Sequence, residues 1–161
     1  SSPAQARRLA ALGGQASVNI YFVHFRAQLH SEHGFGPDRS EATARLGSLQ
    51  RAGAPFALHS DFNLVVTPLS PLLATWCAVN RLGADGETVM APGERISVDS
   101  ALRAITIDAA YILNRDHCLG SLEVGKHADF TILNDDPYEV APSKIKDIEV
   151  HDTVLEGEPT N

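Results

Sequence analysis

The sequence has few cysteines and no long apolar runs. Only Cys77 and Cys118 occur among its 161 residues, so we expect neither a disulfide framework nor a CxxC metal site. No hydrophobic run approaches the length of a membrane span, and the first residues do not form a charged-then-apolar leader. These absences predict a protein of reducing, cytoplasmic surroundings that does not enter a membrane.

The sequence also lacks basic character. Its formal net charge is -7, and its lysines and arginines form no run and do not alternate with aromatic residues. We therefore expect no nucleic-acid partner, because such proteins carry a basic patch or stripe. The hydrophobic content of 43% is enough for a core, and an acidic globular chain suits small-molecule chemistry.

The first third of the chain contains strand and helix patterns in alternation. Pro at a first helical position, glycines at helix ends and runs of Val, Ile, Tyr and Phe mark the boundaries. The expected elements are a helix at 3–12, a strand at 16–25, a loop at 30–37, a helix at 38–53 and a strand at 56–59. This order predicts a βαβ unit with two parallel strands.

The remainder changes from helical to β-prone patterns. Ser70 and Ser97 are typical helix caps, so we expect helices at 71–79 and 97–113 with a loop at 82–93 between them. From Gly120 onward the chain offers short β-prone pieces at 130–133, 148–150 and 154–155, separated by turn residues. We predict two parts, residues 1–115 and a β-rich segment, residues 116–161.

Asp61 is the strongest candidate for chemistry. It follows the short apolar strand at 56–59, and active sites of parallel α/β folds form at the carboxyl ends of strands. A carboxylate there can bind a metal and accept a proton from metal-bound water. The alternative is an aspartate that only caps a helix or stabilises a turn.

The tripeptide His59-Ser60-Asp61 contains the residue types of a catalytic triad. Neighbours on an extended strand point to opposite faces, so these three side chains cannot form a relay. His59 is then expected in the core, with a pocket-lining position as the alternative.

The other histidines divide into two groups. Of His24, His30 and His33, His24 is nearest to the end of the first predicted strand and is our choice for a site role, as a metal ligand or a substrate contact; a solvated loop position is the alternative. We expect surface positions for His117, His127 and His151, and a core position for Cys77.

Several motifs in fixed order resemble one family. The run 56–61, followed by Thr67-Pro68 and Pro71-Leu72, resembles the last barrel strand of the amidohydrolase superfamily, in its YtcJ-like branch. The similarity continues through residues 94–98, 101–104, 106 and 109–110. It ends at 120–130, which looks like the family's "GSLEPGKxADxxxL" signature.

The resemblance implies a fold and an activity. The fold would be the C-terminal portion of a TIM-type (β/α)8 barrel, about its last two strands and their helices, followed by a β-rich segment of a composite β-sandwich. The activity would be hydrolysis of an amide-like C–N bond of a small molecule by metal-activated water. Zinc would be the metal, and Asp61 its ligand and proton shuttle. Separately from the resemblance, we take His24 and Asn63 as the candidate substrate contacts.

The family's other metal ligands have no counterpart in the sequence. Its early His-x-His pair, its bridging carboxylate or lysine and two further histidines are missing, and the chain supplies about two of the eight βα units of a barrel. We therefore expect an inactive isolated chain that needs the missing N-terminal half of the barrel or self-associates. The alternative function is that of a non-catalytic scaffold or oligomerisation fragment.

Overall fold

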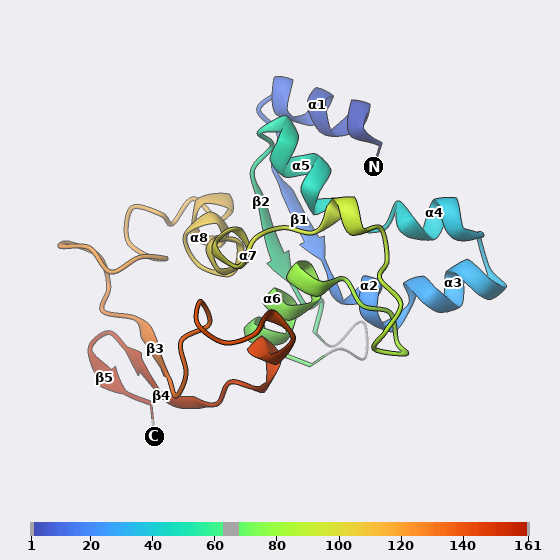
Figure 1. Ribbon diagram of the computed structural model, residues 1–161. Helices are drawn as coiled ribbons and strands as arrows, with labels where there is room; N and C mark the ends of the chain where they lie inside the picture. The colour runs from blue at the N-terminus through green and yellow to red at the C-terminus, as the bar shows by residue number, and fades with distance from the viewer. Residues whose placement is uncertain (1, 63–67, 161) are drawn as a thin grey trace.

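The centre of the fold is a pair of parallel strands. The computed structural model describes residues 2–62 and 68–160. In it β1 (Ala16–Asn19) pairs with β2 (Phe56–His59) in a parallel register that runs from Ala16↔Phe56 to Asn19↔His59 (Figure 1). Helices connect the two strands, so the predicted βαβ unit is confirmed.

The first strand is shorter than predicted. It ends at Asn19, and Tyr21–Phe25 form the short helix α2, so the prediction of one strand over 16–25 is wrong in its second half. The side-chain oxygen Oδ1 of Asn19 accepts a hydrogen bond from the Tyr21 backbone N–H at 3.1 Å, a turn that asparagine commonly forms. The helix that follows buries Tyr21 and Val23, which outweighs the β propensity of these residues.

The connection between the strands contains three more helices, and most of the predicted loop at 30–37 is helical. They are α3 (Ala27–His33), α4 (Pro37–Glu41) and α5 (Leu46–Ala52). The predicted loop at 30–37 and the predicted single helix at 38–53 are both corrected. Ala44 has a φ of +47° between α4 and α5, which a continuous helix does not allow. Gly53 ends α5 in the left-handed conformation, where the sequence predicted the end of the helix.

Helix α1 (Pro3–Ala11) packs against α5, and both lie at the amino-terminal end of the strands in Figure 1. Helix α6 (Pro71–Asn80) begins at Ser70 as predicted, and the Ser70 hydroxyl accepts a hydrogen bond from the Leu73 N–H. Residues 82–93 contain an isolated bridge between Leu82 and Val89 and the start of a 3-10 turn, η1 (Pro92–Glu94).

The predicted long helix at 97–113 is broken in two. Helices α7 (Val98–Ile105) and α8 (Ile107–Ile112) meet at Thr106, which has a φ of -125° and a ψ of -101°. The Thr106 hydroxyl donates to the Leu102 carbonyl at 2.8 Å, a bond that bends helices. Gly120 lies directly against the break, since a Cβ there would be 2.8 Å from the Ile107 Cα. Both helices contact β2.

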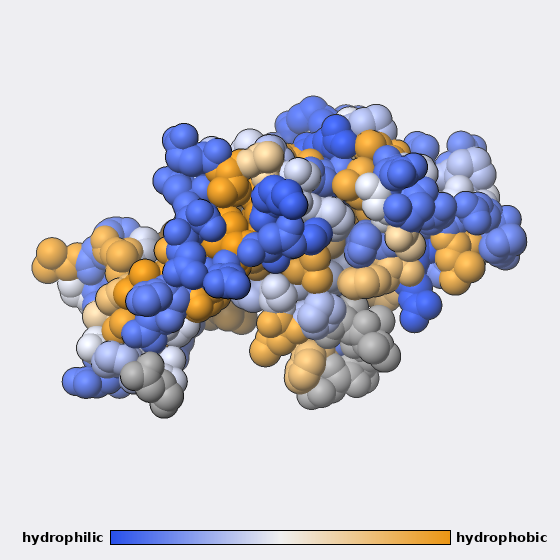
Figure 2. All heavy atoms as spheres, turned by 60° about the horizontal axis from the view of Figure 1, so that its bottom comes forward, coloured by the Kyte–Doolittle hydropathy of each residue, from blue (hydrophilic) through white to orange (hydrophobic). Residues whose placement is uncertain are grey.

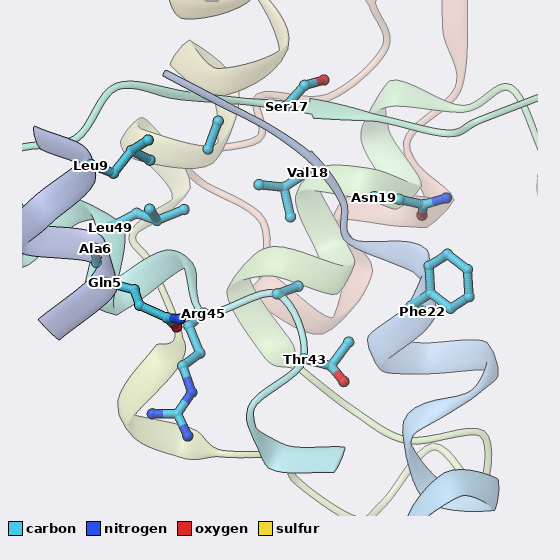
Figure 3. Close-up of a pocket in the computed structure, with 12 residues that line it drawn as sticks. Gln5, Ala6, Leu9, Ser17, Val18, Asn19, Phe22, Thr43, Arg45 and Leu49 are labelled. Carbon is cyan, nitrogen blue, oxygen red and sulfur yellow. The ribbon is translucent and has the colours of Figure 1, made fainter. Parts of the chain in front are cut away.

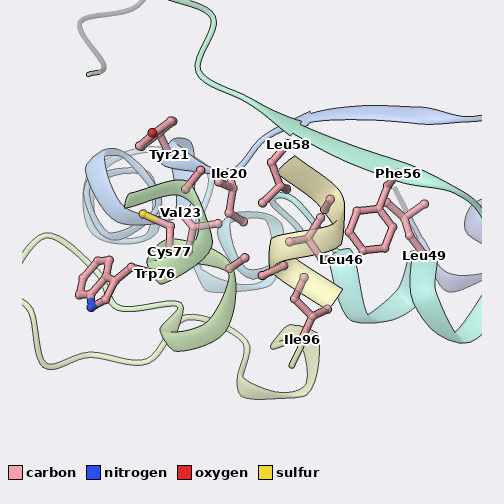
Figure 4. Close-up of a cluster of buried hydrophobic side chains, with 14 of the residues drawn as sticks. Ile20, Tyr21, Val23, Leu46, Leu49, Phe56, Leu58, Trp76, Cys77 and Ile96 are labelled. Atoms are coloured by element: carbon pink, nitrogen blue, oxygen red, sulfur yellow. The ribbon is translucent and has the colours of Figure 1, made fainter. Parts of the chain in front are cut away.

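One hydrophobic core connects most of these elements. Figure 4 shows how side chains from β2, α2, α5 and α6 converge in it. Among its buried members are Ile20, Val23, Leu46, Leu49, Phe56, Leu58, Trp76, Cys77, Ile96 and Ile145. Ile145 belongs to the C-terminal segment, so the core extends into that segment.

The C-terminal segment forms a small antiparallel sheet of β3 (Phe130–Leu133), β4 (Val150–Leu155) and β5 (Glu158–Pro159). The two predicted pieces after residue 148 form the single strand β4. A 3-10 helix that the sequence did not predict, η2 (Pro142–Asp147), packs on α6. The Trp76 indole N–H donates to the Ser143 carbonyl at 3.0 Å, which attaches this segment to α6.

Hydrophobic side chains remain at the surface of the C-terminal segment. Leu122, Val150 and Leu155 are more than half exposed, and Figure 2 shows hydrophobic residues on this left-hand part of the molecule. In the part of the chain that the structure describes, no helix is both long enough and apolar enough to span a membrane.

Candidate functional site

Asp61 lies where the sequence placed it, two residues beyond the carboxyl end of β2. Asn19 and His59, which end the two parallel strands, are partners in register, so Asp61 is at the edge where both strands end. Its φ is +54°, in the left-handed region, which aspartate and asparagine enter more readily than most residues. The half-buried carboxylate residue therefore occupies the edge at which α/β folds bind ligands.

The backbone on either side of Asp61 is held by residues at the end of β1. The Asn19 amide nitrogen Nδ2 donates to the Ser60 carbonyl at 3.2 Å, and the Tyr21 hydroxyl donates to the Ser70 carbonyl at 2.5 Å. Burial raises the pKa of Tyr21 to about 12, with the nearby Cys77 adding to the increase. The phenol therefore stays protonated and remains a donor at neutral pH. Neither Asn19 nor Tyr21 was predicted from the sequence as a site residue, although a polar residue at a strand end was a usable signal for Asn19.

His24 lies on α2 and not at a strand end. Its ring nitrogen Nδ1 is 3.0 Å from the Leu82 carbonyl, and its ring meets Trp76 edge-on at a centroid distance of 5.1 Å. Because a carbonyl only accepts hydrogen bonds, Nδ1 carries the proton and Nε2 of the neutral ring has the free lone pair. Asn63, the other predicted substrate contact, lies outside the described residues.

The structure contradicts the predicted position of one histidine and confirms the predicted positions of three others. His59 is exposed, so the expectation of a core position is wrong: β2 reaches the margin of the core at its last residue, and burial ends with Leu58. As predicted, the exposed histidines include His117, His127 and His151.

Cys77 is fully buried, as predicted, and burial raises the pKa of its thiol to about 12. The thiol is therefore not a nucleophile at neutral pH. Cys77 and Cys118 are both free of disulfides.

The described residues do not form a complete metal site. Among residues 2–62 and 68–160, no three His, Cys, Asp or Glu side chains gather closely enough to hold a metal ion. Zinc in proteins takes about three or four such ligands. Asp61 could supply one of them, so a metal at this edge would need ligands from outside the described part of the chain.

A hollow of about 380 Å³ lies beside β1 (Figure 3). All four residues of β1 line it, and their side chains alternate between the two faces of the strand. The hollow therefore follows the edge of β1 that is not paired with β2. Its other lining residues come from α1, α2, α5 and the loop before α5, and include Leu9, Phe22 and Leu49.

Two curated proteins are similar to parts of the chain. An N-substituted formamide deformylase from Arthrobacter pascens is 33% identical over 110 residues, which is 68% of this chain and 20% of that protein. Protein LONG AFTER FAR-RED 3 from Arabidopsis thaliana is 41% identical over 92 residues, 57% of this chain and 15% of that protein. The chain thus spans about a fifth or less of the length of these relatives.

Solved structures share the fold. An uncharacterized metal-dependent hydrolase from Pyrococcus horikoshii superimposes with a TM-score of 0.69 at 22% identity, covering 86% of this chain and 28% of that chain. An adenosine deaminase from Xanthomonas campestris with bound zinc gives 0.68 at 22% identity and covers 99% of this chain and 34% of that chain. The predicted mixed α/β architecture agrees with both.

A family model described as the amidohydrolase family matches residues 2–160. The match covers nearly the whole sequence, including both motif regions that suggested the resemblance. The chain therefore belongs to the amidohydrolase family.

Proposed function

We propose that this chain is the C-terminal portion of the TIM-type barrel of a metal-dependent amidohydrolase of the YtcJ-like branch, with a β-rich accessory segment at residues 116–161. The observation that carries the proposal is the position of Asp61 at the shared carboxyl edge of β1 and β2, in a chain of this family. The reaction is hydrolysis of an amide-like C–N bond in a small molecule.

Asp61 has two roles in this proposal. Its carboxylate is one ligand of a divalent metal, zinc in our proposal, which when bound supplies hydroxide near neutral pH. The same carboxylate takes up the proton that the attacking water loses and returns it to the leaving nitrogen. The remaining ligands come, in this proposal, from parts of the longer hydrolase that are not in this 161-residue sequence.

His24 and Asn63 are the proposed substrate contacts. With Nδ1 held by the Leu82 carbonyl, Nε2 of the neutral His24 ring can accept a hydrogen bond from an N–H or O–H group of the substrate. The names of two relatives support an amide-like substrate: the formamide deformylase and a probable human imidazolonepropionase, 39% identical over 88 residues, 54% of this chain and 18% of that protein.

Metal content tests the role of Asp61. In the longer hydrolase that contains this chain, we expect stoichiometric zinc by elemental analysis, and loss of most of that zinc and of hydrolysis in Asp61→Ala. The matched control is Asp135→Ala, which removes an exposed carboxylate in the C-terminal segment and should change neither quantity. Full zinc and activity in Asp61→Ala would refute the assignment.

The alternative function, a scaffold or oligomerisation fragment, is favoured by the unpaired strand edges. Among the described residues β1 and β2 pair only with each other, and the hollow along β1 is partly apolar. An exposed strand edge is a template for another strand. In the isolated chain, we propose that this edge is covered by a second copy.

Light scattering tests this self-association. We expect the isolated chain to exceed monomer mass at micromolar concentration and Val18→Lys, which places a charge in the hollow beside β1, to shift it toward monomer. Leu122→Lys changes an exposed apolar residue of the C-terminal segment and serves as the control, with no shift expected. A monodisperse wild-type monomer would count against the proposal.

A further inference from the structure

Two residues of the turn that ends β1 bind backbone carbonyls that lie before and after Asp61 in the sequence. The Asn19 side chain donates to the Ser60 carbonyl, and the Tyr21 hydroxyl donates to the Ser70 carbonyl. These contacts join residues 41 and 49 positions apart in the sequence. The two bonds come from residues separated only by Ile20, which is fully buried, so the anchor itself is fixed in the core.

The bond from Asn19 acts on the backbone angle that places Asp61. The Ser60 carbonyl and the Asp61 N–H belong to one planar peptide group. The φ of Asp61 measures rotation against that plane, so fixing the plane restricts this angle. At +54° Asp61 is in the left-handed region, which is unfavourable for most L-residues and less so for aspartate, so a contact that fixes the peptide plane helps to hold it there.

We propose that Asn19 is a positioning residue that holds the Asp61 carboxylate at the strand edge, and this rests on the role proposed for Asp61. Asparagine suits the position because its side chain has both a donor and an acceptor. Its acceptor Oδ1 binds the Tyr21 N–H and shapes the turn, whereas its donor Nδ2 binds the Ser60 carbonyl. The first bond is structural, and the second fixes Asp61.

Substitution by aspartate separates these two bonds. Asn19→Asp keeps an acceptor for the Tyr21 N–H but has no donor for the Ser60 carbonyl, and Asn19→Ala loses both. Asn80→Asp is the matched control, because the Asn80 amide also donates to a backbone carbonyl, that of Pro142, at 2.9 Å in a different part of the fold.

The measurement is NMR of the full 161-residue chain. A residue with positive φ gives an unusually strong cross-peak between its own amide and α protons. We expect this cross-peak at Asp61 in the wild type and in Asn80→Asp, and its loss in Asn19→Asp and Asn19→Ala. Retention in Asn19→Asp would overturn the proposal, because the turn contact alone would then be sufficient.

Kinetics of the longer hydrolase distinguish this proposal from the role of Asp61 itself. A misplaced carboxylate should lower kcat about tenfold to a hundredfold with little change in KM, so we expect this pattern in Asn19→Asp and wild-type values in Asn80→Asp. Unchanged kcat in Asn19→Asp would overturn the positioning role while Asp61→Ala remained inactive. An active Asp61→Ala would instead refute the proposed function, whatever the NMR result.

Discussion

Replacing Arg81 by methionine is expected to lower the free energy of unfolding by about 3–5 kcal/mol. Arg81 has no solvent-exposed surface, and its guanidinium donates three hydrogen bonds to backbone carbonyls. Nε binds Met90 O at 2.7 Å, Nη1 binds Ala44 O at 2.7 Å and Nη2 binds Thr43 O at 3.0 Å. The side chain therefore joins the end of α6 to two other segments.

The cost arises from the carbonyls that remain after the substitution. Methionine fills much of the volume of the arginine stem but has no donor, so the three oxygens lose a charged partner next to a fully buried side chain. Burial lowers the pKa of Arg81 to about 10, and the charge of Glu94 opposes this shift. The guanidinium is therefore still charged at neutral pH, where all three bonds are charge-assisted.

Arg95→Met is the matched control for Arg81→Met. Arg95 also donates to a backbone carbonyl, that of Asn80 at 3.0 Å, but this contact is exposed. We expect a loss of less than about 1 kcal/mol. Urea denaturation at a fixed protein concentration measures both variants, since self-association would otherwise change apparent stability. Equal stabilities of the two variants would show that the three hydrogen bonds of Arg81 contribute little.

The sequence predicted those elements whose signals are local. The short apolar run of β2 and the capping serines of α6 and α7 are recognisable within a few residues of sequence. The run of β2 alone placed Asp61 just beyond the carboxyl end of a strand. The segment after Asn19 was mispredicted because its aromatic and β-branched residues favour a strand locally. Burial against distant parts of the chain makes it a helix.

The contacts around the site could not be predicted in the same way. Nothing in the residues around Tyr21 shows that its hydroxyl will donate to the carbonyl of Ser70. An arginine after a helix normally indicates an exposed cation at the C-terminal end of that helix. Arg81 is instead in the left-handed conformation and buried. Such partners depend on how helices pack, and that information is distributed over the whole chain.

Replacing Glu94 by alanine is expected to lower the free energy of unfolding by about 2–4 kcal/mol. Glu94 is buried, with 7% of the residue exposed. It accepts hydrogen bonds from the Ser48 backbone N–H at 2.6 Å and from the Ser48 hydroxyl at 2.5 Å. Arg51 adds an ion pair at 3.4 Å.

Glu94 thus serves as the missing cap of α5. Arg45 at the N-cap position makes no side-chain capping bond, and Ser48 N–H is one of the amides that a cap residue normally satisfies. A helix of seven residues has little stability of its own, and a carboxylate at its amino end is favoured by the helix dipole. The contact needs Gly47, because a Cβ there would be 2.8 Å from the Gly93 carbonyl.

Two further variants separate the capping role from simple loss of charge. Glu87→Ala removes an exposed glutamate and should change stability by less than about 0.5 kcal/mol. Glu94→Gln retains an oxygen acceptor for Ser48 and should lose clearly less than Glu94→Ala. If Glu94→Ala and Ser48→Ala were additive in a double-mutant cycle measured by urea denaturation, the bond between the Ser48 hydroxyl and Glu94 would contribute nothing to stability. Ser48→Ala keeps the backbone bond of the cap, so this cycle isolates the hydroxyl bond. We expect a coupling of about 1–2 kcal/mol, because each substitution removes the bond between the Ser48 hydroxyl and the Glu94 carboxylate.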